Sequence, residues 1–151
     1  VRAARGLYDA CLGLEDEAAS RKAASHLLSL FVRHEKLEEA GLFFAEIMEH
    51  GRDVKLDAQS FQVLRGWFKR KEQPLNEARL LRLYGEQNPD DAQAPQVFLD
   101  CAIILQQSLG KGDTAESICR VIQRRYPQSP QAEHAARFIL ARQQTRRGND
   151  K

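Results

Sequence analysis

The sequence lacks long hydrophobic runs. No stretch approaches the ~18 consecutive apolar residues that a membrane-spanning helix requires, and no signal peptide is visible at the amino end. The chain opens with Val1 rather than methionine and starts inside a repeat. We therefore expect it to be a fragment of a longer protein, in which a membrane contact would come only through parts outside this sequence.

Cysteine is scarce. The three cysteines are odd in number and far apart, and each falls in an apolar stretch of helical periodicity: Cys11, Cys101 and Cys119. Such cysteines are typical of small buried hydrophobic side chains in a reducing compartment, with a single disulfide as the alternative. The pattern predicts a cytoplasmic protein or the cytoplasmic domain of a larger one.

Motifs for catalysis and metal binding are missing. The chain has no P-loop, no GxGxxG and no GxSxG. The four histidines show neither HExxH nor a paired Cys–His spacing: His26, His34, His50 and His134. We therefore expect no enzyme activity, no cofactor and no metal site.

A strong net charge is also missing. The 23 Lys and Arg residues against 21 Asp and Glu residues leave a net charge of +2, so no global field attracts nucleic acid or an anionic membrane. Residues 114–147 nevertheless hold seven arginines against two acids. Arginine is suited to carboxylate and phosphate, which favours an acidic partner segment, with a solvated face as the alternative reading.

What the sequence does contain is a repeat. Four alanines recur 36, 38 and 37 residues apart: Ala4, Ala40, Ala78 and Ala115. Three of them are followed at helical spacing by larger apolar residues, whereas Arg82 and Gly85 stand at those positions after Ala78. A period in the thirties is typical of stacked helical hairpins that cannot bury a core alone. The repeat predicts an all-α protein, an α-solenoid of antiparallel helix hairpins.

Apolar periodicity of 3.6 residues divides the chain into eight helices with short loops. We expect them at about 1–14, 18–34, 36–50, 58–71, 75–87, 94–109, 114–126 and 130–146. Asp57, Asp113 and Ser129 are expected as N-caps, and Gly51 as the residue that ends the third helix. The helices form one predicted domain, residues 1–147, followed by a frayed tail at 148–151.

Residues 96–127 resemble a tetratricopeptide repeat. Gly110, Ala115, Cys119, Ile122 and Pro127 fall at the spacings where that family places a turn glycine, a small residue, an apolar residue, another small residue and a closing proline. The junction Tyr126-Pro127-Gln128-Ser129-Pro130-Gln131-Ala132 is similar to those between its repeats. The resemblance implies a right-handed superhelix, and a scaffold that binds a peptide or helix of a partner protein in a concave groove.

The resemblance also implies which residues line the groove, because the first helix of each pair does so in that family. The partner-binding candidates carried over are Arg33, Trp67, Arg70, Lys71, Asp100 and Gln107. The same rule also selects Lys22, Ser25, Ser29, Val32, Ser60, Val63, Val97, Ile104 and Ser108. Trp67 among cations is typical of an interface hot spot. The alternative is that Trp67 belongs to the core and the cations extend around it.

Two other functions stay open. Residues 25–70 resemble a pentatricopeptide array, which implies single-stranded RNA binding, although the small net charge argues against a nucleic-acid partner. The chain could also be a helical accessory domain of a larger enzyme or membrane protein. The face of Leu7, Tyr8 and Cys11 on the first helix would pack on residues outside this chain or on a second copy, as in a homodimer.

Overall fold

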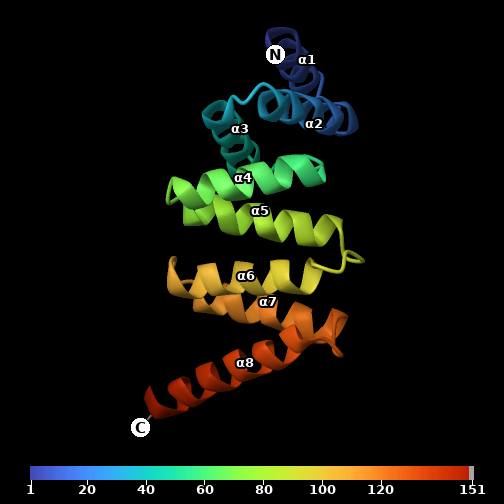
Figure 1. Cartoon of the computed structure of the whole chain (residues 1–151). Coiled ribbons are helices and arrows are strands. Elements are labelled where there is room, and N and C mark those ends of the chain that lie inside the picture. Colours follow the sequence, from blue (N-terminus) through green and yellow to red (C-terminus); the bar gives the residue numbers. More distant parts are fainter. Residues whose placement is uncertain (150–151) are drawn as a thin grey trace. The chain divides into compact units, whose positions relative to one another are not determined.

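The computed structural model describes residues 1–149, and this part of the chain consists of eight α-helices without a β-strand. The helices are α1 (Arg2–Gly13), α2 (Glu17–Arg33), α3 (Leu37–Glu49), α4 (Ala58–Arg70), α5 (Pro74–Gln87), α6 (Ala94–Gln107), α7 (Gly112–Arg125) and α8 (Pro130–Asn149) (Figure 1). The all-α prediction is therefore confirmed. No helix in the described part combines the length and apolar character needed to cross a bilayer.

The chain divides into two compact units, Val1–Leu80 and Leu81–Lys151, so the division falls within α5. In the first unit α1 packs on α2, α2 on α3 and α3 on α4, and α2 also contacts α4. In the second unit α6 packs on α7 and α7 on α8, and α6 also contacts α8 (Figure 1). Within each unit, consecutive helices are therefore neighbours in space.

The four repeated alanines are all buried. Ala78 is buried as fully as the others, although its helix carries Gly85 where a bulky residue is expected. The structure explains the glycine at position 85, because a Cβ atom there would lie 2.9 Å from Cζ of Phe98. The ring of Phe98 on α6 fills the space that a large side chain on α5 would otherwise occupy.

Aromatic side chains contribute to the core of each unit. In the first unit Tyr8 packs edge-on against Phe43 with ring centroids 5.1 Å apart, and Phe44 lies 5.8 Å from Phe68. In the second unit Phe98 lies 6.3 Å from Tyr126. Such aromatic pairs bury large areas and favour edge or offset geometry.

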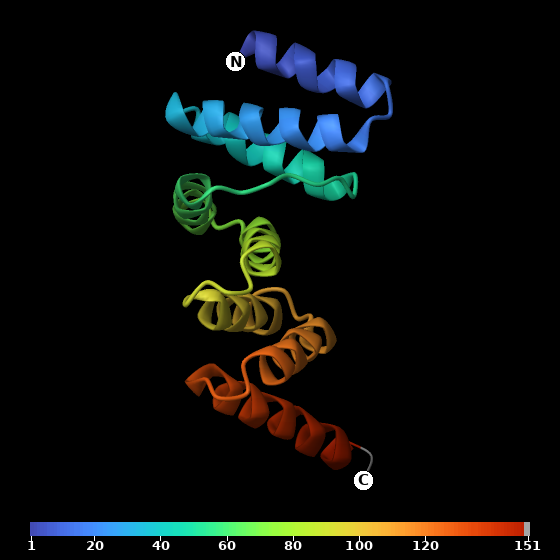
Figure 2. The same cartoon turned by 90° about the vertical axis from the view of Figure 1, so that its right-hand side faces the viewer.

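The segment between α3 and α4 crosses the first unit without regular structure (Figure 2). Val54 and Leu56 are both buried within it, while the residues on either side of each are exposed. The sequence predicts only a short loop here, between the helices expected at 36–50 and 58–71. Its alternating side chains instead add a short, extended strip to the core of the first unit.

Helix ends follow several of the predicted signals. The Asp57 carboxylate accepts a hydrogen bond from Ser60 N at 2.7 Å, and the Ser129 hydroxyl accepts one from Ala132 N at 3.1 Å. Both N-cap predictions are confirmed. The prediction for Asp113 is wrong, because α7 begins at Gly112 with Lys111 as its N-cap residue.

The final helix is longer than its pattern predicts. α8 continues past Arg146 through Gly148 to Asn149, two residues that the sequence places in the tail. The remaining tail positions, 150 and 151, lie outside the described residues.

Three helices end in the same hydrogen-bonded turn. Gly51 has φ +64°, as predicted, and Glu35 and Glu72 adopt the same left-handed conformation at φ +56° and +53°. After each of these residues, the next amide donates to a carbonyl five positions earlier, as in a Schellman motif; the pairs are Lys36 N to Phe31 O, Arg52 N to Ile47 O and Gln73 N to Phe68 O. Two of the three turns therefore hold a glutamate where glycine is usual.

Candidate functional site

Trp67 on α4 lies against α3 because residue 41 has no side chain. A Cβ atom at Gly41 would stand 3.2 Å from both Trp67 Nε1 and Phe68 Cε1. Phe68 continues into the core, whereas Trp67 stays half-buried at the surface. The indole of Trp67 thus both packs on a neighbouring helix and borders solvent, and its role as an interface hot spot stays a prediction.

Two shallow hollows adjoin Trp67. One of about 200 Å³ is lined by Glu38, Gly41, Leu42, Ala45, Trp67, Lys71, Gln73 and Asn76. The other, of about 250 Å³, is lined by Glu35, Lys36, Leu37, Glu38, Glu39 and Trp67. We call the face formed by Glu38, Leu42, Trp67 and Lys71 the Trp67 surface. Leu42 on this surface is 67% exposed.

The charges of the Trp67 surface are separated by helix. Lys71, the C-cap residue of α4, places its Nζ 4.8 Å from the centroid of the Trp67 ring, within cation–π distance. The cations Lys69 and Arg70 precede it in the last turn, where they complement the helix dipole. Acidic residues come instead from α3 and the turn before it: Glu35, Glu38 and Glu39.

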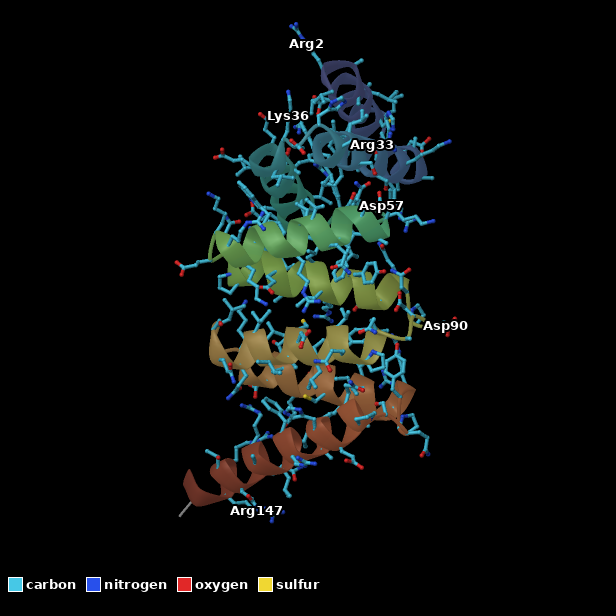
Figure 3. The ribbon with its side chains drawn as sticks, viewed as in Figure 1. Arg2, Arg33, Lys36, Asp57, Asp90 and Arg147 are labelled. Carbon is cyan, nitrogen blue, oxygen red and sulfur yellow. The ribbon has the colours of Figure 1, made fainter. Side chains whose placement is uncertain are left out.

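Arg33 lies in a different hollow of the first unit. This hollow, of about 240 Å³, is lined by Ser25, His26, Ser29, Arg33, Lys55 and Asp57. Figure 3 labels Arg33 and Asp57 on α2 and at the start of α4. Arg33 and Trp67 therefore border separate hollows.

Asp57 organises the hollow that contains Arg33. Its carboxylate accepts hydrogen bonds from the Ser29 hydroxyl at 2.7 Å and from the Ser60 hydroxyl at 3.1 Å, in addition to the Ser60 amide. Partial burial acts to raise the pKa of Asp57, but these hydrogen bonds and the charge of Arg33 outweigh it and lower the pKa below its ordinary value of 3.8. The carboxylate therefore stays ionised and links α2 to α4.

The remaining groove candidates fall into two groups. Asp100 and Gln107 belong to the second unit; Asp100 accepts a hydrogen bond from Gln96 Nε2 at 2.7 Å, and Gln107 is exposed at the end of α6. Of the further positions that the tetratricopeptide resemblance selects, three are buried in the core, so they cannot line an open groove: Val32, Ser60 and Val97. A side chain that packs between helices is not available to a partner.

Several of the arginines near the carboxyl end hold α7 and α8 together. Arg142 Nη2 lies 2.6 Å from Asp113 Oδ1, and both Arg142 and Arg146 pair with Glu116. Arg120 pairs with Glu116 and Arg137 with Glu133. Among the described residues, the arginines of this group that form no ion pair are Arg124, Arg125 and Arg147.

The face predicted for packing on a second copy is not continuous. Leu7 is 55% exposed, but Tyr8 is 1% exposed and packs inside the first unit. Cys11 is half-buried. The part of this face that reaches solvent is thus smaller than the sequence predicts.

The three cysteines are free thiols, and Cys101 and Cys119 are buried. Burial raises the pKa of Cys101 to about 12 and that of Cys119 to about 11. Such thiols remain protonated at neutral pH and behave as apolar core residues. Within residues 1–149, no group of three or more His, Cys, Asp or Glu side chains converges as metal ligands would.

Comparison of the chain with protein-family models, curated proteins and solved structures gave no match.

Proposed function

We propose that this chain is a protein-interaction scaffold, built as an α-solenoid of antiparallel helix hairpins, that docks a peptide or helix of a partner at the Trp67 surface. Packing within each unit supports this architecture, because helices contact both the next helix and the one after it, as α2 does with α3 and α4. The buried alanines at near-constant spacing support it as well. The tetratricopeptide resemblance of residues 96–127 points to the same class of function.

One observation carries the proposed site: Trp67 is half-buried between two hollows, beside the exposed side chain of Leu42. Interface hot spots are enriched in tryptophan and lie where a partner side chain can fill a pocket and exclude water. The absence of a side chain at Gly41 lets the indole pack closely on α3 before any partner arrives. A preorganised anchor loses little side-chain entropy on binding.

The separated charges of the Trp67 surface favour one kind of partner segment. Glu38 and Glu39 border one side of the indole, and Lys71 lies over the ring. A segment that places an apolar side chain beside Leu42 would complement these charges with a basic residue toward α3 and an acidic residue toward Lys71. Such a pattern fixes the orientation of the partner more than it adds affinity.

A selection from a random peptide display library tests the proposal on the whole chain. We expect enriched peptides to contain an apolar residue flanked by opposite charges. Because Trp67 is the sole tryptophan, its fluorescence reports binding at this site directly. Leu42→Glu should weaken the selected peptides by at least about tenfold.

Leu14→Glu is the matched control, since Leu14 is an 80% exposed leucine of the same unit that lines neither hollow. Peptides that bind both variants equally well would place the interaction elsewhere. Failure to enrich any peptide, together with retention on single-stranded RNA that decreases steeply with salt, would replace the proposal by the RNA-binding alternative.

A further inference from the structure

The first helix, α1, presents an apolar stripe to solvent. α1 lies at the edge of the first unit and packs along α2, with Ala4 and Tyr8 as its buried residues (Figure 2). Another side of the helix carries four apolar residues that are all exposed. We call these four the α1 stripe: Ala3, Leu7, Ala10 and Leu14. Leu7 is the one residue that it shares with the face predicted from the sequence.

The spacing of the α1 stripe is that of a coiled-coil seam. Its members are separated by four, three and four residues, as the core positions of two successive heptads are. Such a seam is normally covered by a second helix. Leu7 and Leu14 are both large and exposed, so no helix of the described part of the chain covers the α1 stripe.

Two glycines border the α1 stripe, because Gly6 and Gly13 each directly precede one of its leucines. Glycine within a helix lowers stability relative to alanine, and it is typical of places where another backbone comes close. Gly41 and Gly85 have such neighbours inside the chain, but a Cβ atom at Gly6 or Gly13 would meet no atom of the described residues within 4 Å. These two glycines leave room for a helix from outside the chain to approach the stripe closely.

We propose that two copies of this chain associate through their α1 stripes, with the two helices antiparallel about a twofold axis. In this arrangement Leu7 faces the partner's Ala10, and Leu14 faces the partner's Ala3. Every layer of the seam then combines one large and one small side chain, so the helices pack closely without cavities or overpacking. An interface on a twofold axis has to be complementary to itself, and the α1 stripe meets this condition when it is reversed.

The charges at the two ends of α1 fit the same arrangement. Arg2 begins the helix and extends away from the first unit (Figure 3), while Glu15, Asp16 and Glu17 follow its end. Arg2 and Glu15 are exposed, and both lie outside the ion pairs of the described residues. An antiparallel pair brings the basic start of each helix next to the acidic end of the other, whereas a parallel pair would bring like charges together. The charge pattern therefore favours a second copy as the occupant of the stripe.

The strength of this association follows from its size. Packing on α2 already holds α1 as a helix, so the association does not have to order it. A pair of helices with two heptads each forms a small interface, which is typical of reversible dimers rather than permanent ones. The Trp67 surface takes no part in the contact, so the proposal does not depend on peptide binding there.

Sedimentation of the whole chain over about a hundredfold range of concentration tests the proposal. We expect a reversible dimer, with a dissociation constant that Leu7→Glu raises at least about tenfold. Leu42→Glu is the matched control, since Leu42 is a similarly exposed leucine of the same unit that lies outside the α1 stripe. A monomer at every concentration, or equal weakening by both substitutions, would overturn the proposal.

Gly6→Ala separates the stability of the helix from the association. At a concentration where the chain is monomeric, the alanine should raise the Tm, because it favours the helix and its Cβ atom meets no neighbour. The dissociation constant of the dimer should rise about tenfold, since the added methyl group keeps the two helices apart. A dimer of unchanged affinity would contradict close packing at the α1 stripe.

Charge reversal tests the orientation of the two helices. Arg2→Glu and Glu15→Arg should each raise the dissociation constant about threefold, because each places like charges together at the ends of the antiparallel pair. The two substitutions in one chain should restore the original affinity. A double variant that dimerises no better than the single ones would contradict the antiparallel arrangement.

Discussion

A Cβ atom on Gly41 would stand 3.2 Å from Nε1 of Trp67, so the indole rests on α3 only because residue 41 is glycine. Replacement by alanine forces the ring or the helix to move by a few tenths of an ångström. Phe68 is affected too, since the same Cβ atom would lie 3.2 Å from its ring. One glycine therefore positions both the surface residue and the core residue next to it.

Gly41→Ala should lower the free energy of unfolding by about 1 kcal/mol, because a steric cost of about 1–3 kcal/mol exceeds the helix propensity gained. Urea unfolding followed by Trp67 fluorescence measures the change. Gly66→Ala on α4 is the control, since its Cβ atom would meet only the flexible end of Arg70, at 3.3 Å. The free energy of unfolding of Gly66→Ala should rise by about 0.5–1 kcal/mol. An equal change in the free energy of unfolding in both variants would contradict the packing argument.

Gly85→Ala should destabilise the second unit by about 1–3 kcal/mol through overpacking against Phe98. The added Cβ atom would lie 2.9–3.1 Å from three atoms of that ring. Thermal unfolding followed by circular dichroism measures the loss. The double variant Gly85→Ala with Phe98→Leu should recover part of it, because the smaller side chain makes room for the methyl group. No coupling between the two substitutions would show that the contact carries no strain.

Asp57→Asn should reduce stability at neutral pH, where the ionised carboxylate interacts with Ser29, Ser60 and Arg33. Because the pKa of Asp57 is lowered on folding, the contribution of its carboxylate to stability is complete above pH 3.8. This contribution is lost as the pH falls through the lower pKa of the folded state. The difference between the variant and the original chain should therefore shrink below pH 3.8. Unfolding curves measured across this range provide the test.

Asp16→Asn controls for the loss of charge at a helix N-cap, since Asp16 caps α2 through the Ala19 amide at 3.0 Å and is exposed. Asparagine is as good an N-cap as aspartate. Asp57→Asn should therefore be the more destabilising substitution at pH 7, and an equal effect of both would rule out a special role for the Arg33 hollow.

Alkylation of the cysteines at pH 8 should modify Cys11 first. Cys101 and Cys119 are buried with pKa values raised to about 12 and about 11, so they react only when the chain opens. Mass spectrometry over time gives the order of labelling, and rapid labelling of Cys101 would be inconsistent with its burial.

The stability of the chain should also depend on the two buried thiols at alkaline pH. Since the raised pKa values of Cys101 and Cys119 in the folded chain favour the protonated thiols, the contribution of these residues to stability should decrease as the pH rises above the ordinary pKa of 9.0.

Much of the fold follows from local patterns. The apolar periodicity predicts all eight helices, and Asp57 and Ser129 cap the helices that they are expected to cap. The N-cap expected at Asp113 fails because α7 begins one residue earlier, at Gly112, and the Asp113 carboxylate accepts a hydrogen bond from Arg142 on α8, 29 residues away. No pattern around residue 113 contains that information.

The candidate sites were predictable only as single residues. The sequence singles out Trp67 and its cations, but the approach of Gly41 and the hollows beside α3 depend on how two helices pack. The burial of Tyr8 likewise has no sequence signal, since the sequence places it with Leu7 and Cys11 on a face directed outward, whereas the structure packs its ring on Phe43 of α3.

Glu35 keeps its side chain in a backbone conformation where glycine would be free of strain. A non-glycine residue with positive φ costs about 1–3 kcal/mol, and Gly51 shows that the chain uses glycine for the same turn elsewhere. Since Glu35 lines a hollow beside Trp67 and its turn is hydrogen-bonded back to α2, the end of α2 positions an acidic residue next to the Trp67 surface. If the Trp67 surface binds a partner as proposed, unwinding of that helix terminus should alter the binding without changing Trp67 itself.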